Sequence, residues 1–254
     1  MRDHVLATEE VPEAFDRAAP RYDLMVALNP GYHRHLRSAA AALAERLARG
    51  RSSTRVVDLG CGSGASTRAL VQALQGQPAV QLVGVDASEG MLRQARAKTW
   101  PAEVTFFQGL AEDLAGSRGD WRLEDPVDAV LAAYLFRNVS ERDKVLASVH
   151  DLLKPDGVLV AQEYSVAGSP RADLLWSVVC WVVVIPLSWV ASKDTQLYRY
   201  LWRSVRAFDS VSTFTDRLQA AGFVDVEVRT VPGWQRGILH TFRARRPSQP
   251  PAAP

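Results

Sequence analysis

The chain has 254 residues, near the upper end for a single domain, and 47% of them are hydrophobic while 23% are charged. This composition can bury a sizeable core and excludes wholesale disorder and fibrous repeats. The net charge of only +2 argues against a nucleic-acid partner, which usually needs a larger basic footprint. Two cysteines, Cys61 and Cys180, are too few for a disulfide scaffold or a four-ligand zinc site, so we expect a reducing compartment and no metal centre.

Apolar runs that suit strands alternate with helical patterns along most of the chain. In chain order we expect a helix over 36–49, a strand over 55–59, a helix over 66–75, a strand over 80–85, a helix over 88–98, strands over 103–107 and 127–133, a helix over 140–153, a turn over 154–157, a strand over 158–163, a helix over 213–221, and strands over 224–228 and 238–243. Ser140 and Asp143 form a capping-box pattern at the start of the helix over 140–153. The alternation predicts an α/β fold, with a Rossmann-like, seven-stranded, mostly parallel sheet, helices on both faces and a final antiparallel hairpin.

Three segments stand apart from this alternation. Residues 1–10 are charged and have no apolar core, so they do not form a secretory signal. Residues 247–254 are rich in proline and predict a disordered tail, which leaves 1–246 as a single domain. Residues 168–207 form an insertion, and its stretch 174–192 contains no charged residue. That stretch fits a buried helix covering the sheet, a lid over a pocket for a greasy tail, or a membrane-docking surface with interfacial tryptophans.

A glycine-rich run, Asp58-Leu-Gly60-Cys-Gly62-Ser-Gly64, follows the first predicted strand. Glycines at a strand-to-helix turn let the backbone approach a ligand closely, and a helix N-terminus favours an anionic group. Asp86 ends the second predicted strand, at the distance along the chain where an acidic side chain would hydrogen-bond a ribose. The spacing therefore predicts a nucleoside cofactor at this edge of the sheet.

The pattern Gly60-x-Gly62-x-x-Ala65 also satisfies the dinucleotide fingerprint, so the glycines alone leave a nicotinamide or flavin enzyme open. Asp58 argues against that interpretation, because a carboxylate directly before the loop would repel a pyrophosphate. It suits a ligand with an ammonium group at that point and a carboxylate near the helix end, which describes S-adenosylmethionine.

The same residues carry a family resemblance. The run Asp58 to Gly64, together with Val83-Gly-Val-Asp86-Ala-Ser, resembles the motifs of class I S-adenosylmethionine-dependent methyltransferases. Three further stretches resemble the UbiE-type C-methyltransferases of ubiquinone and menaquinone biosynthesis: Phe15-Asp-Arg-Ala-Ala-Pro-Arg-Tyr22-Asp23, Phe136-Arg137-Asn138-Val139, and Leu153-Lys-Pro-Asp-Gly157 with Glu163. The resemblance extends from about residue 11 to residue 246.

The resemblance implies that S-adenosylmethionine is the cofactor and assigns residues to it. The backbone of the glycine loop would hold the methionine end with Asp58 near its ammonium, Asp86 would accept the ribose hydroxyls, and Met91 would pack on the adenine. The implied cofactor-binding set is Tyr22, Asp58, Gly60, Cys61, Gly62, Gly64, Asp86, Ala87, Met91, Ala111 and Glu112. Leu110 departs from the family, which usually has Asp there, and Glu112 is the nearest substitute acceptor for the adenine amino group.

The resemblance also implies that Arg137 and Asn138, which follow the fourth predicted strand, face the acceptor ring, and they are the candidate catalytic residues. This edge of the sheet is where open α/β sheets bind their ligands. A ring carbon becomes a good nucleophile when an adjacent ring hydroxyl is deprotonated, and Arg137 could stabilise that oxyanion. Its guanidinium stays protonated, so the proton would leave through a water oriented by Arg137, with Asn138 and His33 as further candidates. The alternatives are a structural salt bridge for Arg137 and a surface position for His33. His33, Trp176 and Trp181 are the candidate substrate-binding residues.

The predicted function is C-methylation of a quinol, or of a related isoprenoid or aromatic acceptor, with S-adenosylmethionine as methyl donor. A natural-product or lipid O- or C-methyltransferase stays open, as do an NAD-binding oxidoreductase and a non-catalytic cofactor-binding protein. The expected partner is a small hydrophobic molecule and not a nucleic acid, and the expected location is cytoplasmic. Peripheral membrane contact and a homodimer are further open alternatives.

Overall fold

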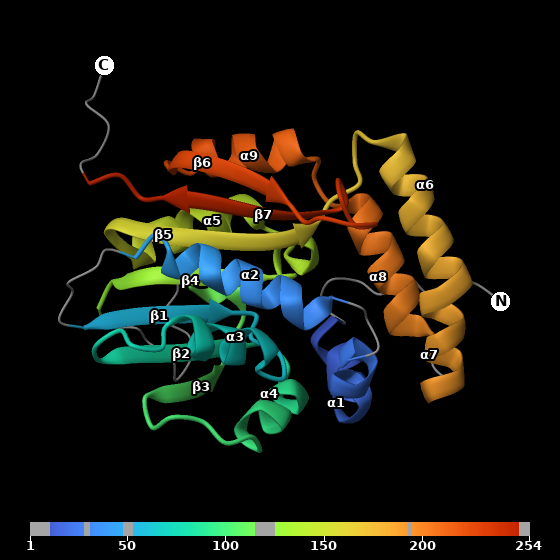
Figure 1. Cartoon of the computed structure of the whole chain (residues 1–254), viewed down its shortest axis with the longest axis horizontal. Helices are drawn as coiled ribbons and strands as arrows, with labels where there is room; N and C mark the ends of the chain where they lie inside the picture. Colours follow the sequence, from blue (N-terminus) through green and yellow to red (C-terminus); the bar gives the residue numbers. More distant parts are fainter. Residues whose placement is uncertain (1–10, 28–30, 48–52, 115–124, 193–194, 249–254) are drawn as a thin grey trace.

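The computed structural model describes residues 11–27, 31–47, 53–114, 125–192 and 195–248. Within these ranges seven strands form one sheet in the order β3-β2-β1-β4-β5-β7-β6 (Figure 1). The strands are β1 (Thr54–Leu59), β2 (Val80–Asp86), β3 (Val104–Gln108), β4 (Val127–Ala133), β5 (Leu153–Tyr164), β6 (Val224–Thr230) and β7 (Leu239–Arg245). Strands β1 to β5 pair in parallel, whereas β7 runs antiparallel to both β5 and β6. The predicted seven-stranded sheet with a final antiparallel hairpin is therefore confirmed.

Helices cover both faces of the sheet. They are α1 (Val11–Ala27), α2 (Tyr32–Ala44), α3 (Ala65–Ala73), α4 (Glu89–Arg96), α5 (Arg142–Leu152), α6 (Pro170–Val179), α7 (Ile185–Ser192), α8 (Gln196–Ala207) and α9 (Val211–Ala220). The apolar faces of α2 and α3 pack on one side of the sheet, and those of α5 and α9 pack on the other. Every residue of the central strand β4 is buried, because it is covered on both sides.

Helices α1, α6, α7 and α8 lie together beyond the end of the sheet where β5 finishes (Figure 1). That end carries the carboxyl termini of the parallel strands, so these helices can enclose a ligand at the edge where α/β sheets bind one. The predicted insertion 168–207 is helical where the structure describes it. It comprises α6, a π-helical turn over Cys180–Val184, α7 and α8.

Two local predictions need correction. The helix predicted over 36–49 starts at Tyr32, directly after Gly31, whose positive φ of 96° forms the helix start, and it ends at Ala44. The capping box at α5 is wrong, because Glu141 occupies the N-cap position without a side-chain cap. Ser140 instead lies near Glu112, and Asp143 pairs with Arg217.

The turn predicted over 154–157 is wrong, because these residues form an irregularity within β5, which runs from Leu153 to Tyr164. Leu153 pairs with Val127, and the next pair joins Val158 to Ala129, so four residues of β5 lie opposite a single residue of β4. Asp156 adopts a positive φ of 63° there. The tail predicted over 247–254 falls mostly on residues 249–254, which lie outside the described residues.

Candidate active site

Two adjoining cavities, of about 140 and 360 Å³, occupy the space between the strand ends and helices α1, α6, α7 and α8. The first, here called the loop cavity, is lined by the glycine loop and by the ends of β1, β2 and β4. The second, here called the apolar cavity, is lined mainly by aromatic and aliphatic side chains. The residues that line both are Phe15, Tyr22, Tyr32, Tyr134, Arg137 and Asn138. The geometry can therefore place a cofactor and an acceptor side by side.

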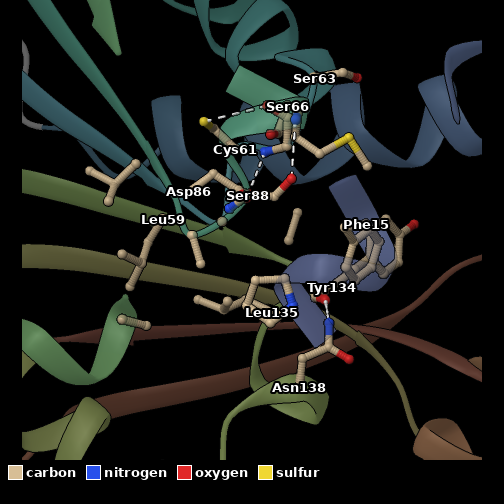
Figure 2. Close-up of a pocket in the computed structure, with 18 of the residues that line it drawn as sticks. Phe15, Leu59, Cys61, Ser63, Ser66, Asp86, Ser88, Tyr134, Leu135 and Asn138 are labelled. Atoms are coloured by element: carbon tan, nitrogen blue, oxygen red, sulfur yellow. Dashed lines mark hydrogen bonds between the residues drawn. The ribbon is translucent and has the colours of Figure 1, made fainter. Parts of the chain in front are cut away.

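The glycine loop turns its backbone toward the loop cavity. Gly60 and Gly62 have positive φ values of 76° and 54°, which other residues rarely adopt. The amides of Gly60 and Cys61 donate to the Val85 carbonyl at 2.7 and 3.0 Å, which joins the loop to the end of β2. A Cβ atom added at Gly62 would meet no atom within 4 Å and would point into open space, so this loop leaves room for a ligand. Figure 2 shows Cys61, Ser63 and Ser66 on one side of the cavity, with Tyr134 and Asn138 on the other.

Gly64 has a different part in the site. It is the N-cap of α3 with a φ of 87°, and it does not line either cavity. A Cβ atom there would come within 2.7 Å of the Trp100 ring. Its predicted contribution to cofactor binding is thus the shape of the turn and not a direct contact.

Asp86 lies at the end of β2 and faces the loop cavity. One carboxylate oxygen accepts the Gly62 amide at 2.8 Å, and the other accepts the Ser88 amide at 2.9 Å. Burial raises the pKa of Asp86, whereas these two amides act in the opposite direction. A carboxylate has about four acceptor positions, so both oxygens can still accept ribose hydroxyls.

Asp58 lies beneath the loop instead of in the cavity wall, and it is fully buried. Its Oδ2 accepts the hydroxyls of Ser66 at 2.8 Å and Thr67 at 2.6 Å, while Oδ1 has no hydrogen-bond partner among the described residues. Burial raises the pKa of Asp58 to about 6. Because the Ser66 hydroxyl donates to Asp58, its lone pairs are free for a cation in the loop cavity, which Ser66 lines.

The residues predicted to surround the adenine all line the loop cavity: Ala87, Met91, Ala111 and Glu112. Met91 is buried, and its amide donates to the Ser88 hydroxyl that caps α4. Leu110 lines the same cavity and is largely exposed, so it offers this end of the cavity only apolar side-chain surface. Glu112 lines the loop cavity, and its carboxylate accepts the Ser140 hydroxyl at 3.5 Å.

Helix α1 closes the loop cavity from outside. The Asp16 carboxylate accepts the Ser88 hydroxyl at 2.6 Å and the Gly90 amide at 2.7 Å, at the N-terminus of α4. Further along α1, Asp23 pairs with Lys98 at 2.6 Å and accepts the Ser63 hydroxyl of the loop. These contacts hold Tyr22, which lines both cavities, over the site.

Four aromatic rings stack in series along the wall of the apolar cavity. The rings of Tyr32, Tyr134, Tyr164 and Trp176 follow one another with centroid separations of 5.6, 5.2 and 5.0 Å. Tyr134 follows the end of β4 with a positive φ of 61°, and Tyr164 ends β5. A flat apolar ring is the ligand that such a wall fits best.

Arg137 stands where the two cavities meet. Its Nη1 donates to Glu163 at 3.0 Å, and both side chains are buried, with exposures of 8% and 0%. Burial lowers the pKa of Arg137, but the Glu163 carboxylate outweighs that effect and raises it overall. Arg137 Nε has no hydrogen-bond partner among the described residues. The structure thus shows the salt bridge that was one alternative for Arg137. It also places the guanidinium where the two cavities meet, with Nε as a donor that has no partner among the described residues.

Asn138 is fixed from two sides. Its Nδ2 donates to the Tyr134 carbonyl at 3.2 Å, and its Oδ1 accepts the hydroxyl of Tyr200 on α8 at 3.1 Å. The helical insertion is thereby joined to the end of β4 at the centre of the site.

The structure does not bring every predicted substrate residue to the site. Trp176 lines the apolar cavity. His33 is exposed and lines neither cavity, which agrees with the alternative that it is a surface residue. Trp181 is 46% exposed and packs edge-on against Trp202 outside the cavity. In the described part of the chain, no three His, Cys, Asp or Glu side chains group in a way that could hold a metal ion.

Sequence reasoning missed several residues of the apolar cavity. They are Phe15, Tyr32, Tyr134, Tyr164, Leu197, Tyr200 and Trp234. Tyr134 and Tyr164 could have been predicted from their position alone, because each directly follows a predicted strand, at the edge of the sheet where ligands bind. Phe15 opens the motif stretch Phe15 to Asp23 but was not assigned to the substrate there. The other four come from segments without a recognisable motif.

Comparison with known proteins agrees with this geometry. The family model described as the ubiE/COQ5 methyltransferase family matches residues 3–242. A ubiquinone/menaquinone biosynthesis C-methyltransferase UbiE of Syntrophotalea carbinolica is 33% identical over 238 residues, covering 91% of this chain and 92% of the relative. A demethylmenaquinone methyltransferase of Clavibacter sepedonicus is 31% identical, covering 79% of this chain and 76% of the relative.

Solved structures show the same fold at lower identity. The plantazolicin methyltransferase BamL, in complex with a substrate analogue and SAH, superposes with a TM-score of 0.64 at 12% identity over 94% of this chain and 98% of its own. Phosphoethanolamine N-methyltransferase 2 of Haemonchus contortus, in complex with S-adenosyl-L-methionine, has a TM-score of 0.55 at 17% identity over 83% of this chain and 52% of its own.

The match over nearly the whole chain excludes the nicotinamide-dependent oxidoreductase that the glycine pattern had left open. The chain belongs to the ubiE/COQ5 methyltransferase family and is an enzyme that uses S-adenosylmethionine.

Proposed function

We propose that the enzyme transfers a methyl group from S-adenosylmethionine to a ring carbon of a reduced quinone that carries an isoprenoid tail. The observation that carries this proposal is the buried Arg137 at the boundary between a cofactor-type cavity and an apolar, aromatic-walled cavity. The names of the two relatives, which refer to quinone biosynthesis, support the same acceptor class.

The residues of the loop cavity fit the cofactor. Gly62 leaves space where a side chain would intrude, Asp86 offers acceptor positions for a ribose, and Ser66 presents lone pairs backed by Asp58. S-adenosylmethionine, when bound, supplies an electrophilic methyl group on a positively charged sulfur. The chain itself must position the acceptor carbon in line with that group and exclude water.

Arg137 supplies the electrostatic part of the proposed chemistry. A quinol carbon becomes nucleophilic when the neighbouring hydroxyl loses its proton, and the guanidinium favours the resulting oxyanion. Glu163 holds the guanidinium in place through Nη1, which leaves Nε available to the acceptor oxygen. In this low-dielectric setting a positioned cation acts more strongly than it would in water.

The tyrosines that surround Arg137 are donors and packing groups in this scheme, not bases. Burial raises the pKa of Tyr22, and it raises the pKa values of Tyr32 and Tyr134 well above the ordinary value. These hydroxyls stay protonated near neutral pH, so the hydroxyl proton of the acceptor leaves by way of solvent next to Arg137 and Asn138. Once the methyl group has passed from the sulfur to the ring carbon, that carbon loses its own hydrogen as a proton, which restores the aromatic ring and its hydroxyl. We infer that the turnover rate rises with pH as more of the acceptor ionises.

An acceptor screen tests the proposal. The purified enzyme receives S-adenosylmethionine with a labelled methyl group and either demethylmenaquinol, demethoxyubiquinol, their oxidised forms, or a panel of phenolic natural products and lipids. We expect label in the reduced quinols and none in the oxidised forms, which lack the ring hydroxyl. Calorimetry with the cofactor serves as the control for a functional loop cavity. Labelling confined to phenolic natural products or lipids, with cofactor binding intact, would contradict the quinol assignment.

A further inference from the structure

The segment from α6 to α7 exposes an unusually apolar surface. Of the ten large apolar side chains that are exposed in the described part of the chain, eight lie between residues 174 and 189. We name these eight the apolar patch: Leu174, Leu175, Val178, Trp181, Val182, Val183, Leu187 and Trp189. Leu174, Val182 and Trp189 are each more than 60% exposed. Contiguous apolar surface of this kind marks an interaction site.

The opposite side of the same segment is packed on the protein. Trp176, Cys180, Ile185 and Ser188 are buried, and the π-helical turn over 180–184 accommodates the five-residue step between Cys180 and Ile185. Residues 170–189 are long and apolar enough to cross a membrane by composition.

Polar contacts nevertheless tie this segment to α8. Asp173 pairs with Arg206 at 2.6 Å, and the Trp202 indole donates to Ser177 at 3.0 Å. Crossing a bilayer would expose both contacts to lipid, so the geometry favours a segment that lies on the surface of a membrane.

The apolar patch is continuous with the apolar cavity. Val183 and Leu187 belong to the patch and also line the cavity, and the partly exposed Trp234 lines it as well. The cavity therefore communicates with the outside through the patch. A chain longer than the cavity would leave the protein at this apolar surface.

Charge favours an anionic surface as the partner. Residues 168–207 contain five basic and two acidic residues, a net charge of +3, whereas the whole chain carries only +2. Arg171 is exposed in the first turn of α6, and Arg199 on α8 lies 5.7 Å from the exposed Trp181 ring. Tryptophans beside arginines are typical of the interface between lipid headgroups and acyl chains.

We propose that the apolar patch docks the enzyme on an anionic lipid bilayer, and that the tail of the acceptor passes from the bilayer between Val183, Leu187 and Trp234 into the apolar cavity. The docking rests on the patch and its charge alone. The path of the tail rests on the proposed function.

Vesicle co-sedimentation tests the docking. The full chain is mixed with vesicles of equimolar phosphatidylcholine and phosphatidylglycerol, and with vesicles of phosphatidylcholine alone. The test variant is the double substitution Leu174→Glu with Val182→Glu, since neither residue lines a cavity. The control is Ala102→Glu with Thr105→Glu, which makes the same charge change at exposed positions in and beside β3, away from α6 and α7 (Figure 1).

We expect the wild type and the control to bind the anionic vesicles, and the test variant to lose at least about tenfold in partition constant. Calorimetry with S-adenosylmethionine should give the same dissociation constant for all three proteins, which shows that the variants are folded. An equal loss of vesicle binding in the control and the test variant would overturn the proposal, because it would show that binding depends on net charge and not on the apolar patch. A wild type that ignores vesicles and forms a dimer, which the test variant dissociates in light scattering, would assign the patch to a second copy instead.

Activity separates the docking from the path of the tail. With a short-tailed, water-soluble quinol, the test variant should turn over like the wild type. With a long-tailed quinol embedded in vesicles, its rate should fall in proportion to its lost binding. Equal rates of the wild type and the test variant on the embedded acceptor would overturn the proposed path of the tail. If the wild type turned over neither acceptor, that result would count against the proposed function, and the vesicle-binding result would still stand.

Discussion

Arg137 is the side chain on which the proposed chemistry depends most, and its ion pair complicates the obvious substitution. Removing one partner of a buried pair leaves the other unpaired, which costs about 3–5 kcal/mol of stability. We therefore expect Arg137→Ala to lower stability as well as activity. The double substitution Arg137→Ala with Glu163→Gln removes both charges of this pair, so neither is left unpaired, and it separates the loss of stability from the loss of activity.

For this double variant we expect kcat to fall by about 10²–10³-fold, because an oxyanion stabiliser is lost, with an unchanged dissociation constant for S-adenosylmethionine. Stopped assays with saturating acceptor and calorimetry give the two values, and Glu163→Gln alone is the control. Near wild-type kcat in the double variant would show that Arg137 is a structural residue only.

We expect Asp58 to make cofactor affinity depend on pH. Its pKa of about 6 is above the ordinary value, and the cofactor's ammonium group, if bound near Asp58 as predicted, would favour the ionised form. Binding therefore releases a proton, and the dissociation constant should rise by up to about tenfold per pH unit as the pH falls below 6. In the cofactor-free protein, pH acts on the stability of the fold in the opposite direction. Because the pKa of Asp58 is higher in the folded chain than in the unfolded chain, its protonation stabilises the fold as the pH falls from about 6 toward 4.

Calorimetry across this pH range on the wild type and on Asp58→Asn measures the effect. We expect the variant to bind more weakly near neutral pH and to lose most of the pH dependence. Asp86, whose pKa is also raised, is present in both proteins, so the difference reports Asp58. If the dissociation constants of the two proteins changed with pH in parallel, the ammonium group of the cofactor would bind away from Asp58.

At this scale the motif residues were predictable, whereas of the four stacked rings of the acceptor wall only Trp176 was predicted. Gly60, Gly62 and Asp86 stand at fixed positions because the turn and the strand end dictate residue type. Tyr32 and Tyr200 come from helices whose orientation no local pattern encodes, so their approach to the site emerges only from packing.

Helix α1 covers the loop cavity, and we expect it to control access to that cavity. Asp16 accepts two hydrogen bonds at the N-terminus of α4, where a negative charge is favoured. Asp16→Ala should raise the dissociation constant for S-adenosylmethionine by about tenfold, since charge-assisted hydrogen bonds of this kind contribute about 1–3 kcal/mol.

Amide hydrogen exchange should show faster exchange in residues 11–27 of that variant. Glu13→Ala, at an exposed position of the same helix, is the matched control. If both variants bind the cofactor equally well, α1 does not act as a cover.

Elements with a strong periodic pattern were predicted closely, and those shaped by tertiary contacts were not. Strand β4 matches its predicted bounds because a continuous apolar run in a central strand has few alternatives. The irregularity inside β5 depends on how β5 pairs with β4. The missing capping box at α5 depends on the contact between Asp143 and Arg217. The insertion was recognised as apolar, but its division into α6, α7 and α8 was not predicted.

For the molecule as a whole, the sheet order determines where chemistry can occur. Strands β1, β2, β4 and β5 end at the same edge. The glycine loop and Tyr134 follow β1 and β4, and Asp86 and Glu163 lie in the last two residues of β2 and β5. The alternation of strands and helices predicted this architecture, and the observed sheet order confirms it. The assignment of 1–246 to a single domain stays a prediction.

The position of the transferred methyl group tests the central claim most directly. The enzyme is incubated with isotopically labelled S-adenosylmethionine and a reduced, prenylated quinol, and the product is examined by nuclear magnetic resonance. The account predicts the label on the ring carbon beside a hydroxyl, with that hydroxyl unmethylated. Label on an oxygen atom, or no transfer by an enzyme that binds the cofactor normally, would contradict it.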